Sequence, residues 1–264
     1  MATPLPRARK RFGQHFLHDP MVLDRIVEAI SPSSADRLVE IGPGRGALTR
    51  ELLAAPHASL DVIEIDRDLA GLLRESLPAG PNFALHEGDA LEFDFAALAA
   101  GRGGKLRVIG NLPYNISTPL LFHLLSSAAH VEDMHFMLQR EVVARIAAQP
   151  GDDDYGRLTV MLAPWVAAES LFEVGPGAFQ PPPKVWSAVV RLTVRQPAFA
   201  ISPNFAAVVA AAFSHRRKTL RNALKDVASR EEIASANVDD AVRPETLAPE
   251  DFNRIAQAID ERIR

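Results

Sequence analysis

The 264-residue chain contains no cysteine. Disulfide bonds, thiolate metal sites and cysteine nucleophiles are therefore excluded. Its eight histidines show no grouping of the HExxH kind, in which two histidines on one helix face ligate a metal. We accordingly expect no metal centre.

The chain also lacks any run that approaches the ~20 apolar residues of a membrane span. Its N-terminus is basic and contains proline, without the apolar core that is typical of a signal peptide. These absences predict a cytoplasmic protein without a membrane partner, and we expect it to be a monomer.

Net negative charge is small, at −4, but the charge is unevenly distributed. Two segments are basic without an intervening acid, so the remainder of the chain is markedly acidic. Patches of one sign, rather than net charge, govern the binding of polyanions. The two segments predict contact with nucleic acid, although an ordinary solvated surface remains the alternative. The residues are Arg7, Arg9, Lys10 and Arg11 in the first segment, and Arg216, Arg217, Lys218, Arg221 and Lys225 in the second.

Apolar runs alternate with helical patterns through most of the chain, which predicts an α/β fold with a mostly parallel sheet. After about Gln196 no strand-like run occurs. We predict two domains, 1–196 with the sheet and a small helical domain at 197–264. Strands are expected near 37–41, 60–65, 83–86, 106–109, 134–138, 167–174 and 185–194, and helices near 19–30, 47–55, 68–77, 117–125, 142–147, 155–165, 205–213, 219–227 and 251–263.

Glu40-Ile41-Gly42-Pro43-Gly44-Arg45-Gly46 follows the first predicted strand and precedes a helix. Such a turn binds nucleotides because only glycine lets the backbone approach the ligand so closely. The glycines fall two residues apart, unlike the GxGxxG of dinucleotide folds. This spacing resembles the E-x-G-x-G-x-G signature of class I methyltransferases that use S-adenosylmethionine; a tight structural turn is the alternative.

Acidic residues end the next two predicted strands. Glu64 and Asp66 both lie at the distance from the glycine loop that suits an acceptor for ribose hydroxyls. Strand alternation places them on the same side, so geometry does not choose between them. Asp89, after the third strand, is placed to accept from the adenine amine of a cofactor.

The fourth of these strands leads into Gly110-Asn111-Leu112-Pro113-Tyr114. Asn111 and the Leu112 carbonyl can accept hydrogen bonds, Pro113 stiffens the turn, and Tyr114 offers a flat aromatic face. This combination suits an adenine as substrate, whereas a turn whose Asn bonds its own backbone is the alternative.

A later loop contains Phe179 and the triple proline 181–183. Triple proline occurs in polyproline ligands of adaptor domains. We favour instead a rigid hairpin that holds Phe179 over the active site.

Five stretches together resemble the adenine dimethyltransferases of small-subunit ribosomal RNA, the bacterial KsgA (RsmA) group with its eukaryotic and mitochondrial relatives. Nearly the whole chain is covered. The stretches are 10–17 (KRFGQHFL), 39–46 (VEIGPGRG), 110–119 (GNLPYNISTP), 178–185 (AFQPPPKV) and 216–222 (RRKTLRN).

The resemblance implies a Rossmann-like methyltransferase domain followed by a helical RNA-binding domain. It implies transfer of methyl groups from S-adenosylmethionine to two adjacent adenosines in the 3′-terminal hairpin of 16S rRNA, in the assembling 30S particle. It favours Glu64 over Asp66, and Tyr114 and Phe179 would sandwich the target base. The implied cofactor contacts are His15, Leu17, Gly42, Gly44, Glu64, Asp89 and Asn111.

Three rivals remain. A 23S rRNA methyltransferase of the antibiotic-resistance type shares the glycine loop and the NLPY-like motif, but 179–185 and the Arg216 cluster favour the small-subunit group. A binding protein that lost turnover, as in mitochondrial transcription factors, is disfavoured by the intact motifs at 40–46 and 111–114. An oxidoreductase is disfavoured by the glycine spacing. The bulky Trp186 also departs from the small or polar residue usual in the resembled group.

Overall fold

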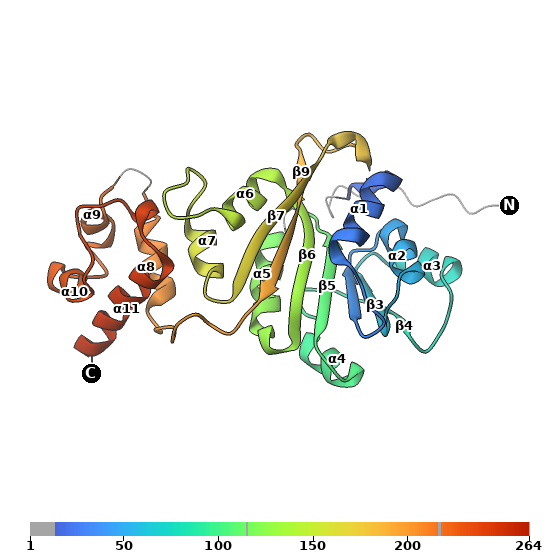
Figure 1. Ribbon diagram of the computed structural model, residues 1–264, viewed down its shortest axis with the longest axis horizontal. Helices are drawn as coiled ribbons and strands as arrows, with labels where there is room; N and C mark the ends of the chain where they lie inside the picture. Colours follow the sequence, from blue (N-terminus) through green and yellow to red (C-terminus); the bar gives the residue numbers. More distant parts are fainter. Residues whose placement is uncertain (1–13, 115, 216–217, 264) are drawn as a thin grey trace. The chain divides into compact units, whose positions relative to one another are not determined.

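A computed structural model describes residues 14–114, 116–215 and 218–263 (Figure 1). Its central feature is a seven-stranded sheet with the strand order β4-β3-β2-β5-β6-β9-β7. β2 pairs in parallel with β3 and β5, β3 with β4, and β5 with β6, while β9 runs antiparallel to β6. The expected α/β fold with a mostly parallel sheet is confirmed. The strands are β2 Arg37–Ile41, β3 Ser59–Glu64, β4 Phe83–Glu87, β5 Leu106–Asn111, β6 Val131–Gln139, β7 Val166–Val174 and β9 Ser187–Val194.

Helices connect the parallel strands, as right-handed crossovers require. Helix α1 illustrates the local chemistry: Asp19 caps it by accepting from the backbone N–H of Met21 at 2.9 Å, and Leu23, Ile26 and Ile30 are buried. That buried face packs with residues of α2, β2 and β3 in one apolar cluster. The helices up to β7 in the chain are α1 Pro20–Ile30, α2 Ala47–Ala54, α3 Arg67–Ser76, α4 Phe95–Arg102, α5 Ser117–Ser126, α6 Arg140–Ala147 and α7 Arg157–Leu162.

A second, two-stranded sheet joins distant parts of the chain. Strand β1 (Phe16–Leu17) pairs antiparallel with β8 (Phe179–Gln180), and His18 N–H donates to the Ala178 carbonyl at 3.0 Å. Sequence patterns do not identify β1, because two residues are too few to show the alternation of a strand. This pairing fixes the chain just before α1 against the loop between β7 and β9.

The chain divides into two compact units, residues 1–143 with 169–194 and residues 144–168 with 195–264. The second unit has its own core, in which Phe205, Leu220 and Phe252 are fully or almost fully buried. It includes residues 144–168, which lie within the predicted sheet domain 1–196. A boundary between folding domains at 196 stays a prediction. Its later helices are α8 Phe205–Ala212, α9 Leu220–Leu224, α10 Arg230–Ser235 and α11 Pro249–Ile263.

Two helices, α4 and α10, were not predicted, and two others, α7 and α9, are shorter than the ranges 155–165 and 219–227 expected from the sequence. Helix α4 carries signals that could have identified it, since Asp94 caps its start and Gly103, with φ 72°, ends it. Helix α10 likewise starts with a capping box formed by Ser229 and Glu232. Helix α7 begins only at Arg157. None of the described helices is long and apolar enough to cross a membrane.

A largely buried ion network ties the amino ends of β5 and β6 to the turn before β2. The Arg107 guanidinium donates to Asp36 at 2.6 Å and to Asp133 at 2.8 Å, and it also donates to the Ile30 carbonyl at 2.7 Å. The three charged side chains are 11%, 16% and 12% exposed, respectively. Removing one charge from such a network leaves its partners desolvated and uncompensated.

We predict that Arg107→Met lowers the free energy of unfolding by about 3–5 kcal/mol, because two carboxylates stay buried without their cation. Urea unfolding followed by circular dichroism measures this change. Arg191→Met is the matched control, since Arg191 pairs with Glu169 on the surface and such pairs contribute about 0–1 kcal/mol. Equal losses in the two variants would contradict a special role for the buried network.

Candidate functional site

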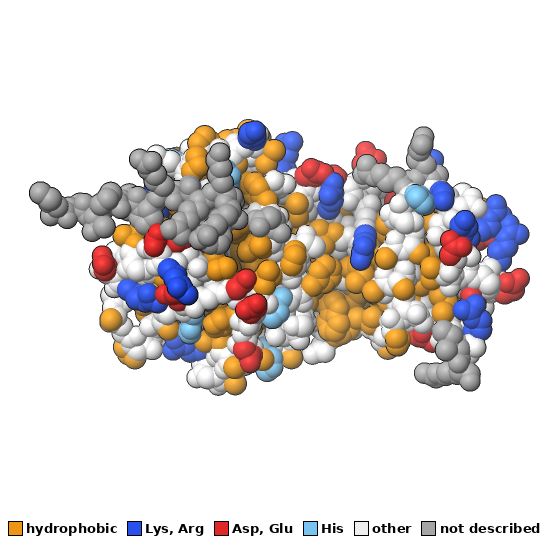
Figure 2. All heavy atoms as spheres, turned by 180° about the vertical axis from the view of Figure 1, so that it is seen from behind, with side chains coloured by type: hydrophobic (Ala, Val, Ile, Leu, Met, Phe, Trp, Pro, Cys, Tyr) orange, Lys and Arg blue, Asp and Glu red, His pale blue; other side chains and the backbone are white. Residues whose placement is uncertain are grey.

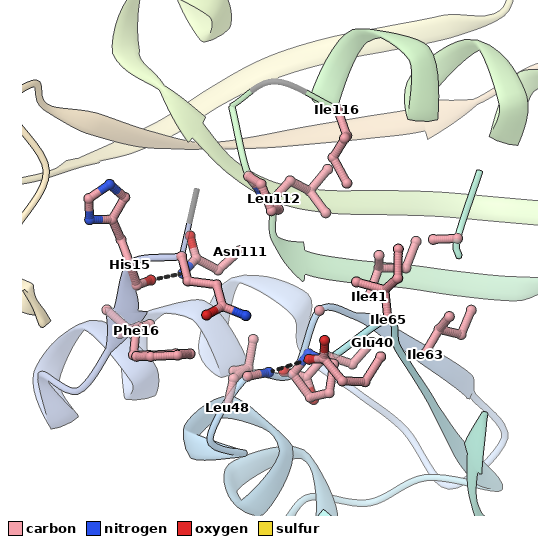
Figure 3. A pocket seen from close by; sticks show the side chains of 18 of the residues that line it. His15, Phe16, Glu40, Ile41, Leu48, Ile63, Ile65, Asn111, Leu112 and Ile116 are labelled. Carbon is pink, nitrogen blue, oxygen red and sulfur yellow. Dashed lines mark hydrogen bonds between the residues drawn. The ribbon is translucent and has the colours of Figure 1, made fainter. Parts of the chain in front are cut away.

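The carboxyl ends of β2, β3, β4 and β5 meet at one edge of the sheet, where a cavity of about 150 Å³ opens (Figure 3). Open α/β sheets bind ligands at this edge. Ten of the predicted site residues come together there: His15, Leu17, Gly42, Gly44, Glu64, Asp89, Asn111, Leu112, Pro113 and Tyr114.

The loop after β2 forms one wall of the cavity. Gly42, Gly44 and Gly46 all have positive φ, between 59° and 75°. Two features exclude a side chain at Gly44. Its positive φ disfavours residues other than glycine, and a Cβ would lie 2.9 Å from Cδ1 of Phe16. The glycine spacing noted in the sequence therefore corresponds to a left-handed turn pressed against the N-terminal segment.

Glu64 ends β3 and is almost fully buried beside this loop. One carboxylate oxygen accepts from Gly44 N–H at 3.1 Å, and the other accepts from Asp66 N–H at 2.9 Å. Burial raises the pKa of the Glu64 carboxyl to about 7. The two hydrogen bonds oppose this rise in pKa, and the charge of Asp66 adds to it. A carboxylate has about four lone-pair sites, so Glu64 keeps acceptor capacity for a ligand hydroxyl.

Asp66 has a different position. Its side chain caps α3 by accepting from Asp68 N–H at 3.1 Å, and it accepts from Gln14 Nε2 at 3.3 Å. It does not line the cavity, whereas Glu64 does. The two acids that the sequence could not separate thus differ in what they contact, and the geometry supports Glu64 as the one that faces a ligand.

Glu40 lies beneath the loop and is 2% exposed. The Thr49 hydroxyl donates to it at 2.6 Å. Burial raises the pKa of Glu40 to about 7; the Thr49 hydrogen bond opposes this rise and the charge of Glu64 increases it. The cavity thus contains two closely spaced buried carboxyl groups, a setting that favours a cationic ligand.

Asn111 stands opposite the N-terminal segment, at the end of β5. Its amide nitrogen donates to the carbonyl of His15 at 2.9 Å, which Figure 3 shows as a dashed line. The His15 ring in turn lies 2.8 Å, through Nδ1, from the Pro181 carbonyl. These contacts orient the Asn111 amide so that its Oδ1 is the acceptor left for a ligand.

Gly110, directly before Asn111, must be small. A Cβ there would lie 2.8 Å from the Ile41 carbonyl on β2 and 2.8 Å from a methyl group of Leu112. The glycine therefore lets β5 lie close to β2 at the end of the strand.

Tyr114 lies at the edge of the cavity and is held from two sides. Its hydroxyl is 3.0 Å from the Ser187 hydroxyl at the start of β9. Its ring stacks on the His15 ring, with centroids 6.2 Å apart and an interplanar angle of 29°. An aromatic face is thus fixed next to the Asn111 acceptor.

The remaining predicted cofactor residues lie at separate points of the cavity. Asp89 is half-buried after β4, and one of its oxygens accepts from Leu91 N–H at 2.9 Å. Leu17 contributes from β1. Asp89 keeps its other oxygen for a ligand.

Several apolar residues of the lining were not predicted from the sequence, among them Phe16 and Ile65. Phe16 packs under the glycine loop, with the Arg45 guanidinium 4.5 Å from its ring centroid. Ile65 is 45% exposed between Glu64 and Asp66. An apolar residue flanked by two acids at a strand end was the available signal for Ile65.

Phe179 does not lie over the cavity, so the predicted placement of its loop is wrong. The Phe179 ring is 3% exposed and packs among buried apolar residues that include Leu17 and Val189. Its pairing with Leu17 in the β1–β8 sheet places it there. Stacking on a substrate would require the ring to leave this core.

The predicted basic segments are described only in part. Arg7, Arg9, Lys10, Arg11, Arg216 and Arg217 lie outside the described residues. Lys218 is half-buried, and Arg221 is exposed on α9. Lys225 lies 3.9 Å from the Asp226 carboxylate. On the face drawn in Figure 2, Lys and Arg side chains are interspersed with Asp and Glu.

Within the described ranges, no group of three or more His, Asp or Glu side chains could hold a metal ion.

Comparison with known sequences shows which proteins this chain is similar to. The family described as ribosomal RNA adenine dimethylase matches residues 6–261. A protein of Pseudomonas aeruginosa named "Ribosomal RNA small subunit methyltransferase A" is 56% identical over 258 residues, covering 97% of this chain and 96% of the relative. The protein of the same name from Marinobacter nauticus is 53% identical, covering 96% of this chain and 92% of the relative.

Solved structures share the fold over almost the whole chain. A dimethyladenosine transferase from Plasmodium falciparum has a TM-score of 0.75 at 26% identity and covers 94% of this chain and 98% of its own. The 23S rRNA methyltransferase ErmE has a TM-score of 0.71 at 27% identity and covers 93% of this chain and 99% of its own.

We predict that Glu40→Gln stabilises the protein at pH 8 but not near pH 4.5. The raised pKa of Glu40 means that its favourable contribution is complete below the unfolded value of 4.5 and is lost as pH rises through about 7. Glutamine mimics the protonated carboxyl at every pH. The gain in the free energy of unfolding should reach about 1–3 kcal/mol above pH 7.

Urea unfolding of both proteins between pH 4.5 and 8 measures this gain. Glu28→Gln, at an exposed position of α1, is the control and should give no comparable change with pH. A stability difference between parent and Glu40→Gln that does not vary with pH would show that folding does not raise the pKa of Glu40.

Proposed function

This chain belongs to the ribosomal RNA adenine dimethylase family, and we propose that it transfers methyl groups from S-adenosylmethionine to the N6 amines of two adjacent adenosines near the 3′ end of 16S rRNA. Membership makes the protein an rRNA adenine dimethyltransferase. That the target is the 3′-terminal hairpin, and that the substrate is the assembling 30S particle, are further parts of our proposal. The observation that carries the proposal is identity above 50% over nearly the full length of both chains.

The alternative substrate is 23S rRNA, because the fold is also that of ErmE. The solved structures do not discriminate between the two substrates, since the dimethyladenosine transferase and ErmE have similar TM-scores of 0.75 and 0.71. The sequence relatives discriminate between the two substrates, because the 56% and 53% identical proteins are both named for the small subunit. We therefore favour 16S rRNA.

The residues of the cavity fit S-adenosylmethionine. The glycine loop removes side chains where a ligand would approach, and Glu64 keeps lone pairs for ribose hydroxyls. Asp89 can accept from the adenine amine, and the exposed Ile65 offers an apolar surface for the adenine ring. Two buried carboxyl groups favour a ligand with positive charge.

When bound, S-adenosylmethionine supplies an electrophilic methyl group on a sulfonium centre. The chain's contribution is to hold the target amine in line with that methyl group, and correct positioning is worth up to ~7–11 kcal/mol of the barrier. The Asn111 oxygen and the Leu112 carbonyl would accept the protons of the amine. These hydrogen bonds draw the nitrogen lone pair out of the ring and toward the methyl group.

A dimethylated product follows from the same residues. No group in the site has to take up a proton before the amine reacts, because the amine is held by acceptors alone. A monomethylated amine still has one proton to donate. The site can therefore bind it for a second transfer.

The target base would stack on Tyr114 after leaving its helix, at a cost of a few kcal/mol. The Ser187 hydroxyl and the His15 ring already hold the Tyr114 ring in place. The residues predicted to grip the surrounding RNA are Arg7, Arg9, Lys10, Arg11, Arg216, Arg217, Lys218 and Arg221. A cytoplasmic monomer acting on the 30S particle is part of this proposal.

We predict that the purified protein converts adenosine to N6,N6-dimethyladenosine in 30S particles from cells that lack this modification. Mass spectrometry of nuclease digests should locate four methyl groups on two adjacent adenosines of 16S rRNA. Asn111→Ala should reduce the rate by about 10²-fold or more, because the amine loses its positioning acceptor. Monomethyladenosine as the only final product, or modification confined to 23S rRNA, would refute the assignment.

We predict that Glu64→Gln weakens binding of S-adenosylmethionine by about tenfold or more, since a charged acceptor contributes about 1.5–3 kcal/mol to a hydrogen bond. Isothermal titration calorimetry measures this change. Asp66→Asn is the matched control: its carboxylate caps α3, so the variant should lose stability rather than affinity. If Asp66→Asn lost the larger share of affinity, the ribose contact would belong to Asp66.

A further inference from the structure

Trp186 is an exposed tryptophan beside the site that the proposed chemistry does not use. It is 49% exposed, and Val185 before it is 44% exposed. Among the described residues they are two of the five large hydrophobic side chains that remain exposed, and they are the two that adjoin in sequence. A paired apolar surface of this kind indicates a binding surface more often than a single exposed residue does.

The backbone of Trp186 is fixed on the functional edge of the sheet. Its carbonyl accepts from Arg140 N–H at 2.9 Å, directly beyond the Gln139–Ser187 pair of β6 and β9. The next residue, Ser187, holds the Tyr114 hydroxyl at 3.0 Å. Trp186 is thus one residue from a direct contact of the ring that is proposed to stack on the target base.

One edge of the indole is supported and the ring remains accessible. A Cβ at Gly175 would lie 3.6 Å from the indole, so the ring packs against bare backbone at the end of β7. An aromatic ring supported in this way is ordered before it binds and loses little conformational freedom on binding.

The charge around the indole suits a polyanion. Lys184, two residues before Trp186, is exposed, and no acidic residue occurs between Gly175 and Val190. Arg140 is also exposed, although it lies 3.5 Å from the Glu173 carboxylate. Lys184 is therefore the exposed cation nearest to Trp186 in sequence.

We propose that Trp186 stacks on an unpaired nucleotide adjacent to the target adenosine, with Lys184 near the phosphate of that nucleotide. This inference rests on the proposed function. Removing a base from its helix leaves its neighbour without a stacking partner, and an aromatic side chain can replace that partner. Such stacking does not depend on base identity and strengthens binding by about 5- to 150-fold per base.

Trp186→Ala should raise KM for undermethylated 30S particles by about tenfold, with kcat and the affinity for S-adenosylmethionine unchanged. Trp186→Phe, which keeps an aromatic face, should restore most of the affinity. Phe122→Ala, which removes another exposed ring at 38% exposure, is the matched control and should leave KM unchanged.

Fluorescence provides a readout that does not depend on turnover. The chain has two tryptophans, so Trp165→Phe leaves Trp186 as the only one. Single-stranded oligoadenylate should quench the emission of this variant at low salt, while duplex RNA of the same length should quench it much less. Lys184→Ala should weaken the quenching and reduce its dependence on salt.

Four outcomes would overturn the proposal while the parent enzyme still dimethylates 16S rRNA. They are an unchanged KM in Trp186→Ala, a loss of kcat alone, equal quenching by duplex RNA, and a dimer that dissociates on Trp186→Ala. The second would make Trp186 a support for Tyr114, and the fourth would assign the surface to a second copy of the chain. Failure of the proposed function is distinguishable, because the parent itself would then not methylate 30S particles.

Discussion

Parallel pairing of β5 with both β2 and β6 is the constraint on which the rest of the first unit depends. Parallel strands all end at the same edge of a sheet, so the loops after them are brought together whatever their sequence. The close approach of β5 to β2 requires Gly110, since a side chain would meet the Ile41 carbonyl at 2.8 Å. The position of Asn111 is therefore determined by backbone packing before any ligand contact is considered.

Buried carboxyl groups have different partners at the two ends of these strands. At the amino ends, Arg107 compensates Asp36 and Asp133 with hydrogen bonds of 2.6 and 2.8 Å, which stabilises the fold. At the carboxyl ends, Glu40 and Glu64 are buried with neutral donors, and burial raises the pKa of each to about 7. These two carboxyl groups line the cavity, where a cationic ligand can offset their charge.

The sequence predicts the sheet strands well because each is a contiguous apolar run, and it predicts the cavity because its residues follow those runs directly. It does not predict contacts made by distant segments. Strand β1 has two residues and exists only by pairing with β8, and the same pairing buries Phe179, which sequence alone placed over the site. Glu64 and Asp66 could not be separated by alternation, since what distinguishes them is that Asp66 caps α3. Trp186 was noted only for its size, because exposure is a property of the fold.

The contacts of His15 with Asn111 and with Pro181 limit when the Asn111 amide can be held during synthesis of the chain. The two contacts join residues 96 and 166 positions apart in sequence. Contacts of such separation form late, because long loops must close first. During translation, His15 and Asn111 emerge well before residue 181, so the acceptor cannot be fully held until most of the chain has been synthesised. In a growing chain the His15 ring therefore has no Pro181 carbonyl to contact until residue 181 has been made.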